Sequence, residues 1–287
     1  MQAIRSILVV VDPSQNEDLA LKRAKLIASV TQSHLHILIC DKKTDHSALL
    51  CDLTEELNNE GFSVTSQQAW NESLHQTIVT VQQSEGCGLV VKQHSHDSLL
   101  KKAILTPDDW KVLRYCPAPV LLVKTDTSWT DGVILAAVDV GNSDAEHRTL
   151  HSTIVSHGYE IATLAQSALH VVSAHPSPML SAADPTFQLT ETIQARYRAN
   201  CAEFQKQYDV TDDRLHIVEG PADVLIPQTA KRLNASVVVV GTVARTGLSG
   251  VLIGNTAEVI LDTLETDILV LKPDDIIEHL EQLVAQR

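Results

Sequence analysis

The chain has 287 residues, of which 44% are hydrophobic and 20% are charged, and its formal net charge is -14. This length is typical of roughly two folded domains. Because an acidic surface repels phosphate groups, we expect neither non-specific binding to nucleic acid nor docking on anionic membranes. No apolar stretch reaches the roughly 18–20 residues of a membrane span. The five cysteines lack metal-ligand spacing and are typical of reduced thiols, so we expect a cytoplasmic protein.

The first predicted strand, residues 7–11, is a continuous apolar run that ends at Asp12, and residues 133–138 form a similar run that ends at Asp139. Such runs are typical of strands buried on both faces of a parallel sheet. Four further pairs of segments correspond in the same order: 35–37 with 169–171, 69–71 with 219–221, 89–92 with 238–241, and 120–124 with 268–272. The collinear pairs predict a tandem repeat, with domains at residues 1–126 and 131–287 joined by a short polar linker.

Helical patterns alternate with these strands. Ser14-x-x-Glu17 and Ser143-x-x-Glu146 predict capping boxes at two helix starts. Further helices are expected over residues 71–85, 222–234 and, as a short amphipathic tail, 274–287. Strands that alternate with helices predict an α/β fold with a doubly wound parallel sheet and helices on both faces.

One candidate site follows the strand at 238–241, where the chain runs from Gly241 through several glycines to Gly254 and a predicted helix start. Glycines let the backbone approach a ligand, and free N–H groups at a helix start attract phosphate. Arg245 adds a positive charge, while Asn255 and Thr256 offer hydrogen bonds. The segment therefore favours an anion site, and the alternative is a plain flexible loop in which Asn255 caps the helix.

The spacing of Gly241 and Gly254 also matches a known motif, G-x2-G-x9-G-[ST]. Ala244 replaces the second glycine, and Asn255 replaces the Ser or Thr, with Thr256 directly after it. The segment resembles the ATP-binding loop of the universal stress protein family. Other segments that resemble tandem-domain members of this family are 90–92, 106–110, 116–120, 241–247 and 254–258.

The resemblance implies two Rossmann-like, adenine nucleotide alpha hydrolase-like domains, each a five-stranded parallel sheet of order 3-2-1-4-5. It implies a stress-response role and ATP or AMP as ligand, with Mg²⁺ accompanying ATP and no metal site of the protein's own. The residues it assigns to the nucleotide are Asp139, Ala174, Gly241, Ala244, Arg245, Gly247, Gly254, Asn255 and Thr256. Asp139 and Ala174 fall near the adenine, although Asp139 is equally typical of a turn at a helix entry.

The first repeat differs at the same place, where Lys92 and His94 follow the strand and Pro107 lies at the helix start. Side chains fill the space that a phosphate would need, and proline has no N–H to donate. We therefore expect the first repeat not to bind ATP in the family manner. His94, His96 and Asp97 could suggest a metal site, but we expect these side chains to be solvated.

The last strands of the two repeats, 120–123 and 268–271, are apolar edges that would be sticky if exposed. We expect them to pair as an intrachain pseudo-dimer. The sequence does not decide whether the whole chain also forms a homodimer. The sequence contains no convincing catalytic constellation, so we expect at most slow ATP hydrolysis, with Asp139 as its only candidate base. The alternative to nucleotide binding is an interaction module for an apolar metabolite or lipid, and the sequence does not identify a protein partner.

Overall fold

The computed structural model describes residues 4–15, 17–94, 107–141, 145–175, 186–242, 245–247, 250–252 and 255–285. The chain divides into two compact units, residues 1–128 with 242–287, and residues 129–241. These units reflect packing, whereas the predicted domains at 1–126 and 131–287 reflect the sequence repeat. The repeat boundary therefore stays a prediction, and each unit is described by itself.

Among the described residues, the main sheet of the first unit has the spatial strand order β3-β2-β1-β4-β5-β12. Its strands are β1 (Ser6–Val11), β2 (His34–Cys40), β3 (Val64–Ala69), β4 (Leu89–Gln93), β5 (Val120–Val123) and β12 (Asp267–Leu271). The first five are parallel, so the predicted order 3-2-1-4-5 is confirmed for the first repeat. Strand β12 pairs antiparallel with β5, and Leu269 lies opposite Leu121. The last strands of the two repeats therefore pair with each other, as predicted.

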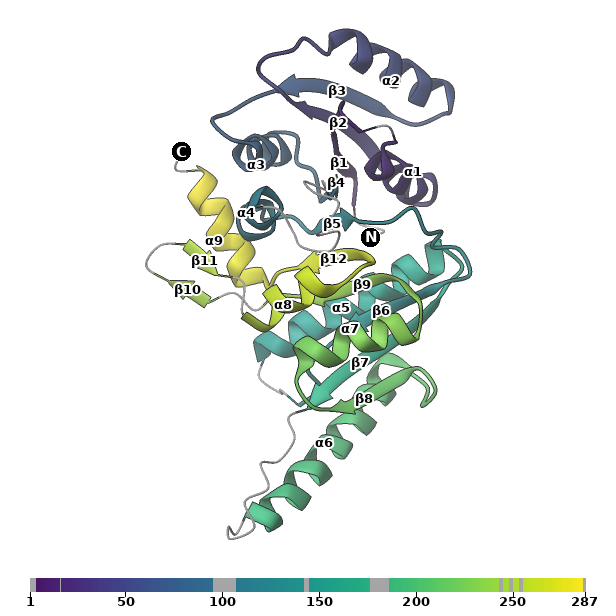
Figure 1. Ribbon diagram of the computed structural model, residues 1–287, viewed down its shortest axis with the longest axis vertical. Coiled ribbons are helices and arrows are strands. Elements are labelled where there is room, and N and C mark those ends of the chain that lie inside the picture. Colours follow the sequence, from purple (N-terminus) through teal and green to yellow (C-terminus); the bar gives the residue numbers. More distant parts are fainter. Residues whose placement is uncertain are drawn as a thin grey trace. The chain divides into compact units, whose positions relative to one another are not determined.

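Helices cover both faces of these strands (Figure 1). Helix α1 packs along β1, β4 and β5, while α3 and α4 pack against each other on the other face. The helices of this unit are α1 (Leu19–Thr31), α2 (Ser47–Asn59), α3 (Leu74–Ser84), α4 (Pro107–Tyr115), α8 (Asn255–Thr263) and α9 (Asp274–Ala285). Because both faces are covered, Leu8 and Val91 at the sheet centre are fully buried.

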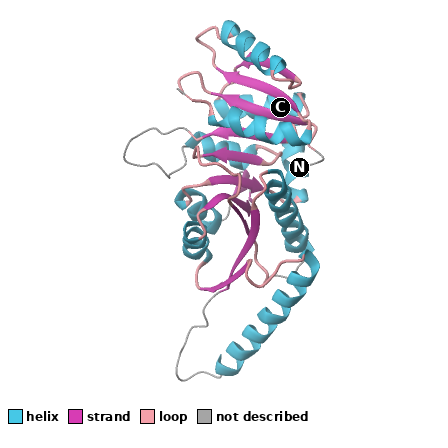
Figure 2. Cartoon of the chain, turned by 90° about the vertical axis from the view of Figure 1, so that its right-hand side faces the viewer, coloured by secondary structure: helices cyan, strands magenta, loops and turns pink. Residues whose placement is uncertain are grey.

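The second unit contains four parallel strands in the order β9-β6-β7-β8. They are β6 (Val133–Ala137), β7 (Ala168–His175), β8 (Leu215–Glu219) and β9 (Ala235–Gly241), and the helices are α5 (Ala145–Leu164), α6 (Thr186–Tyr208) and α7 (Ala222–Arg232). Helix α5 packs on β6, β7 and β9, and α7 packs on β7 and β9. Helices lie on both sides of the strands (Figure 2). The order repeats that of β4-β1-β2-β3 in the first unit.

The predicted capping box at Ser14 is wrong. Helix α1 begins at Leu19, and Asp18 is its N-cap, where the side chain accepts a 2.7 Å hydrogen bond from the N–H of Leu21. The backbone N–H and the hydroxyl of Ser14 instead donate to Asp12, at 3.0 and 2.7 Å. The carboxylate at the end of β1 therefore engages Ser14 in a turn before the helix starts. Ser143 lies outside the described residues.

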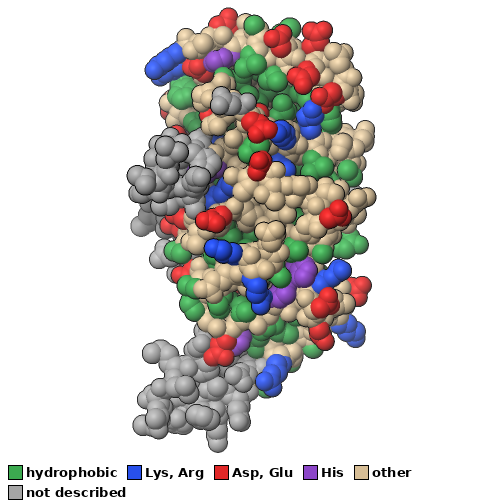
Figure 3. Space-filling view, turned by 45° about the vertical axis from the view of Figure 1, so that its right-hand side comes forward, with side chains coloured by type: hydrophobic (Ala, Val, Ile, Leu, Met, Phe, Trp, Pro, Cys, Tyr) green, Lys and Arg blue, Asp and Glu red, His purple; other side chains and the backbone are tan. Residues whose placement is uncertain are grey.

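The predicted amphipathic tail is confirmed as α9. Ile276 and Leu280 are buried, and Leu283 packs against them. Within the described ranges, no helix is long and apolar enough to cross a membrane. On the face drawn in Figure 3, acidic and basic side chains of the described residues are interspersed.

Candidate functional site

Three of the predicted site residues lie together at the carboxyl edge of the second unit's sheet. Ala137 at the end of β6 is in register with Val172 of β7 and with Val240 of β9. Counting along each strand, Asp139 is therefore level with Ala174 and one residue beyond Gly241. The strand order reverses direction between β6 and β9, which is the position where open α/β sheets bind ligands.

Asp139 is exposed and holds the turn that follows β6. Its Oδ1 accepts a 3.1 Å hydrogen bond from the N–H of Gly141, and its own N–H donates to Nε2 of the buried His151 at 3.3 Å. The interpretation of Asp139 as a turn residue is therefore confirmed. A nucleotide contact would use the remaining lone pairs of the same exposed carboxylate.

The buried side chains of Ser173 and Tyr197 hold this turn in place. The Ser173 hydroxyl accepts a 3.1 Å bond from the N–H of Val140 and is itself hydrogen-bonded to the hydroxyl of Tyr197 on α6. Burial raises the pKa of Tyr197 to about 12, so its hydroxyl stays protonated. A Cβ on Gly141 would lie 2.8 Å from Cε2 of Tyr197, so the turn requires glycine here.

Sequence reasoning missed Ser173 and Tyr197. Gly141, two residues after Asp139, was a detectable signal for a tight turn, but Tyr197 is far away in the chain and no spacing links it to this turn. The ring of Tyr197 also lies 4.8 Å from that of His175, centroid to centroid, so two aromatic rings border this part of the edge.

Gly241 has a packing role that its sequence context did not reveal. A Cβ at this position would lie 2.7 Å from Cδ2 of Leu150 and 2.9 Å from Cδ1 of Ile154. Both side chains belong to α5, so the glycine lets this helix pack closely on the end of β9. Close helix packing alone explains glycine at Gly241, independently of any ligand.

Of the remaining predicted residues, Ala244 and Gly254 lie outside the described residues. The others belong to the first unit and are Arg245, Gly247, Asn255 and Thr256. Arg245 and Gly247 form β10 (Arg245–Gly247), which pairs antiparallel with β11 (Gly250–Leu252). This hairpin was not predicted, because its strands of three residues are too short to give a periodic pattern. Helix α8 begins at Asn255, with Thr256 in its first turn, so the predicted helix start is confirmed.

The corresponding edge of the first unit is filled by a buried polar cluster. Asp109 of α4 accepts hydrogen bonds from Nζ of Lys92 at 2.7 Å and from Nδ1 of His94 at 2.8 Å. The three side chains are at most 5% exposed. Burial alone would raise the pKa of Asp109, but the hydrogen bond from His94 and the charge of Lys92 hold it well below its usual range.

The prediction that His94 is solvated is therefore wrong. Its partner Asp109 comes from the following helix, and no sequence spacing joins the two residues. His96 and Asp97 lie outside the described residues. Among the described residues, no group of three or more His, Cys, Asp or Glu side chains could hold a metal ion.

Several known proteins are similar to this chain in sequence or in structure. The model of a family described as the universal stress protein family matches residues 132–272. Universal stress protein E of Escherichia coli K12 is 30% identical over 96% of this chain and 96% of its own length. The homologue of that protein in Haemophilus influenzae is 31% identical over 89% of this chain and 84% of its own.

Two solved structures are also similar. The crystal structure of a functionally unknown protein from Pseudomonas aeruginosa has a TM-score of 0.94 and 66% identity, and covers 100% of this chain and 99% of its own. A universal stress protein from Archaeoglobus fulgidus shares the fold, with a TM-score of 0.62 and 15% identity over 94% of this chain and 99% of its own.

Proposed function

Since the chain belongs to the universal stress protein family, we propose that it is a cytoplasmic stress-response protein whose second repeat binds an adenine nucleotide, ATP or AMP. The observation that carries this proposal is the position of Asp139 beside Gly241, where the strand order of the second unit reverses. Strand β7 adds Ala174 at the same level.

In this proposal the carboxylate of Asp139 recognises the adenine. An ionised carboxylate only accepts hydrogen bonds, so it pairs with the exocyclic amino group of the base. The turn bond from Gly141 and the Ser173 hydroxyl beneath Val140 restrict the backbone around Asp139. The carboxylate is thus held in position before a ligand arrives, which lowers the entropy lost on binding.

The phosphates are assigned to the segment before α8. Backbone N–H groups at Gly254, Asn255 and Thr256 would face the phosphates at the helix start, where the helix dipole also favours negative charge. Gly241, Ala244, Arg245 and Gly247 complete the proposed set. Mg²⁺ would enter with ATP, bound by the phosphates and water. The protein acts through binding, with at most slow hydrolysis.

The first repeat is proposed not to share this activity. Lys92, His94 and Asp109 fill the space at the end of β4, and α4 begins at Pro107, which lacks an N–H for a phosphate. One nucleotide per chain is therefore expected.

The test is calorimetric titration of the full chain with ATP and with AMP, using a matched pair of variants. Asp139→Asn is expected to weaken binding about tenfold, since it removes a charge-assisted hydrogen bond. Asp12→Asn is the control, because Asp12 occupies the same position at the end of β1 and is expected to leave binding unchanged. Gly254→Glu is expected to abolish binding by placing a carboxylate in the phosphate site.

The proposal fails if millimolar nucleotide gives no heat with the wild-type chain, or if Gly254→Glu binds as the wild type does. The alternative, a nucleotide-independent module for an apolar metabolite or lipid, rests on the Ala244 and Asn255 departures from the motif. Native mass spectrometry of freshly purified protein separates the two, because an apolar adduct favours the module and an adenine nucleotide favours the proposal.

A further inference from the structure

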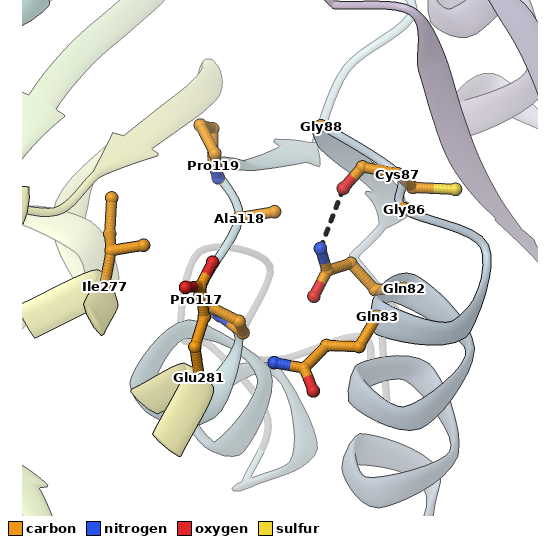
Figure 4. Close-up of a pocket in the computed structure, with 10 residues that line it drawn as sticks. All are labelled: Gln82, Gln83, Gly86, Cys87, Gly88, Pro117, Ala118, Pro119, Ile277 and Glu281. Atoms are coloured by element: carbon orange, nitrogen blue, oxygen red, sulfur yellow. Dashed lines mark hydrogen bonds between the residues drawn. The ribbon is translucent and has the colours of Figure 1, made fainter. Parts of the chain in front are cut away.

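The first unit contains a pocket of about 500 Å³ that lies away from the carboxyl edge of the sheet. Its walls are residues 82–83 at the end of α3, residues 86–88 before β4, residues 117–119 before β5, and the side of α9 that carries Ile277 and Glu281 (Figure 4). Gly88 and Pro119 directly precede β4 and β5. The pocket therefore opens at the amino ends of these strands. The proposed nucleotide site, in contrast, uses the carboxyl ends of strands in the second repeat.

The backbone of the pocket wall offers few hydrogen-bond donors, although the side-chain amide of Gln83 also lines the pocket. The backbone N–H groups of Gly86, Cys87 and Gly88 already donate to the carbonyls of Gln83, Gln82 and Ser6, at 3.2, 2.9 and 2.9 Å. Pro117 and Pro119 have no N–H at all. A ligand rich in acceptors, such as a phosphate, would therefore find few donors here.

Hydrogen-bond acceptors are present on two sides of the pocket. Gln82 is only 8% exposed, and its amide is oriented by a 2.8 Å bond from Nε2 to the carbonyl of Cys87. Its Oε1 is directed toward the pocket and has no hydrogen-bond partner among the described residues, but the atom itself is buried. The carboxylate of Glu281 enters from α9 on the other side (Figure 4).

The surroundings add negative potential. Helices α3 and α4 end at Ser84 and Tyr115, directly before two of the pocket walls, and a helix carries partial negative charge at its C-terminal end. The last turn of α3 contains no basic residue, whereas the last turn of α7 in the second repeat contains Lys231 and Arg232. The last turn of α4 contains one basic residue, Arg114, whose guanidinium donates to Glu258 at 2.7 Å.

We propose that this pocket binds a small organic cation, an aliphatic amine whose ammonium group pairs with Glu281 beside the amide of Gln82. The side chains of Ile277 and Pro117 offer apolar contact to the alkyl part of the ligand. The volume lies within the roughly 300–1,000 Å³ of small-molecule pockets. This site is independent of the nucleotide proposed for the second repeat.

The test is calorimetric titration of the full chain with 1,5-diaminopentane, and 1,5-pentanediol serves as the uncharged analogue. Because the chain carries a net charge of -14, a diffuse attraction must be separated from a site. Glu281→Lys and Glu278→Lys change the net charge equally and lie on the same helix, but only Glu281 lines the pocket. Glu281→Lys is expected to weaken diamine binding more than tenfold, and Glu278→Lys less than twofold.

A second variant keeps the test decisive if the charge reversal disturbs α9. Gln83→Arg places a cation at the pocket from the end of α3, where a basic residue also suits the helix dipole, and it is expected to weaken the diamine about tenfold. Circular dichroism checks the folding of each variant. The proposal is overturned if millimolar diamine gives no heat, if the diol binds equally well, or if Glu278→Lys weakens binding as much as Glu281→Lys.

Discussion

Lys124 and Lys272 occupy equivalent positions in the two repeats, directly after β5 and β12, and both are buried. Nζ of Lys124 donates to the carbonyls of Leu261 and Leu264 at the end of α8, at 2.9 and 2.8 Å. Nζ of Lys272 has no hydrogen-bond partner among the described residues. Burial lowers the pKa of both lysines to about 8. The hydrogen-bonded Lys124 therefore stabilises the fold, whereas the unpartnered Lys272 destabilises it.

Lys272→Met is expected to stabilise the protein at pH 7 by about 1–3 kcal/mol, because it removes a buried, unpartnered charge. The folded-state pKa of Lys272 is about 8 against 10.5 when unfolded, so the wild type gains stability as the pH rises between these values. The advantage of the variant is thus full below pH 8 and shrinks above it. Urea unfolding at several pH values measures this, with Lys124→Met as the matched control. That control should destabilise, and equal effects of the two substitutions would contradict the assignment.

At the scale of elements, Asp109 joins α4 to the end of β4. It is fully buried between Lys92 and His94, which lie two residues apart at the end of β4, whereas Asp109 comes from the following helix. A buried ion pair adds little net stability when complete, but the loss of one partner leaves the other charge uncompensated. The helix therefore depends on Asp109 more than on any exposed residue of its first turn.

Asp109→Asn is expected to lower the free energy of unfolding by about 3–5 kcal/mol, because Lys92 loses its buried counter-charge. Asp108→Asn, at the neighbouring half-buried position, is the control and should change it by less than about 0.5 kcal/mol. The pKa of Asp109 is lowered, so its contribution is full above its ordinary value of 3.8 and is lost as the pH falls further. Urea unfolding at pH 7 and at pH values below 3.8 measures both effects, and an Asp109→Asn variant as stable as the wild type would refute this role.

The elements differ in how far the sequence predicted them. Apolar runs such as residues 7–11 and 133–138 predicted the strands and their repeat, because burial on both faces leaves a continuous pattern. The helix start at Asn255 was equally predictable from local sequence signals. The burial of His94 depends on a partner brought by the fold, and Gly241 is explained by α5 packing that no local motif encodes.

At the scale of the whole molecule, Asp267 connects the last strand of the second repeat to the first. Its Oδ1 accepts the N–H groups of Lys124 and Thr125 at 2.8 and 3.1 Å, and its Oδ2 accepts a 2.8 Å bond from Nε of Arg23 on α1. Apolar residues of β5 and β12 pair beside it. The predicted repeats divide the chain between residues 126 and 131, but this pairing places residues 242–287 in one compact unit with residues 1–128.

The predicted domains can be tested by co-expressing residues 1–126 and 131–287 as separate chains. We expect a stable one-to-one complex, because β5 and β12 are apolar edges that each cover the other and because Asp267 fixes their register. Asp267→Lys should release the pieces, since it places a cation against the buried Arg23. Asp274→Lys, an exposed change of equal charge at the start of α9, should leave the complex intact. Size-exclusion chromatography with light scattering measures the mass, and wild-type pieces that elute separately would show that the strand pairing does not hold the repeats together.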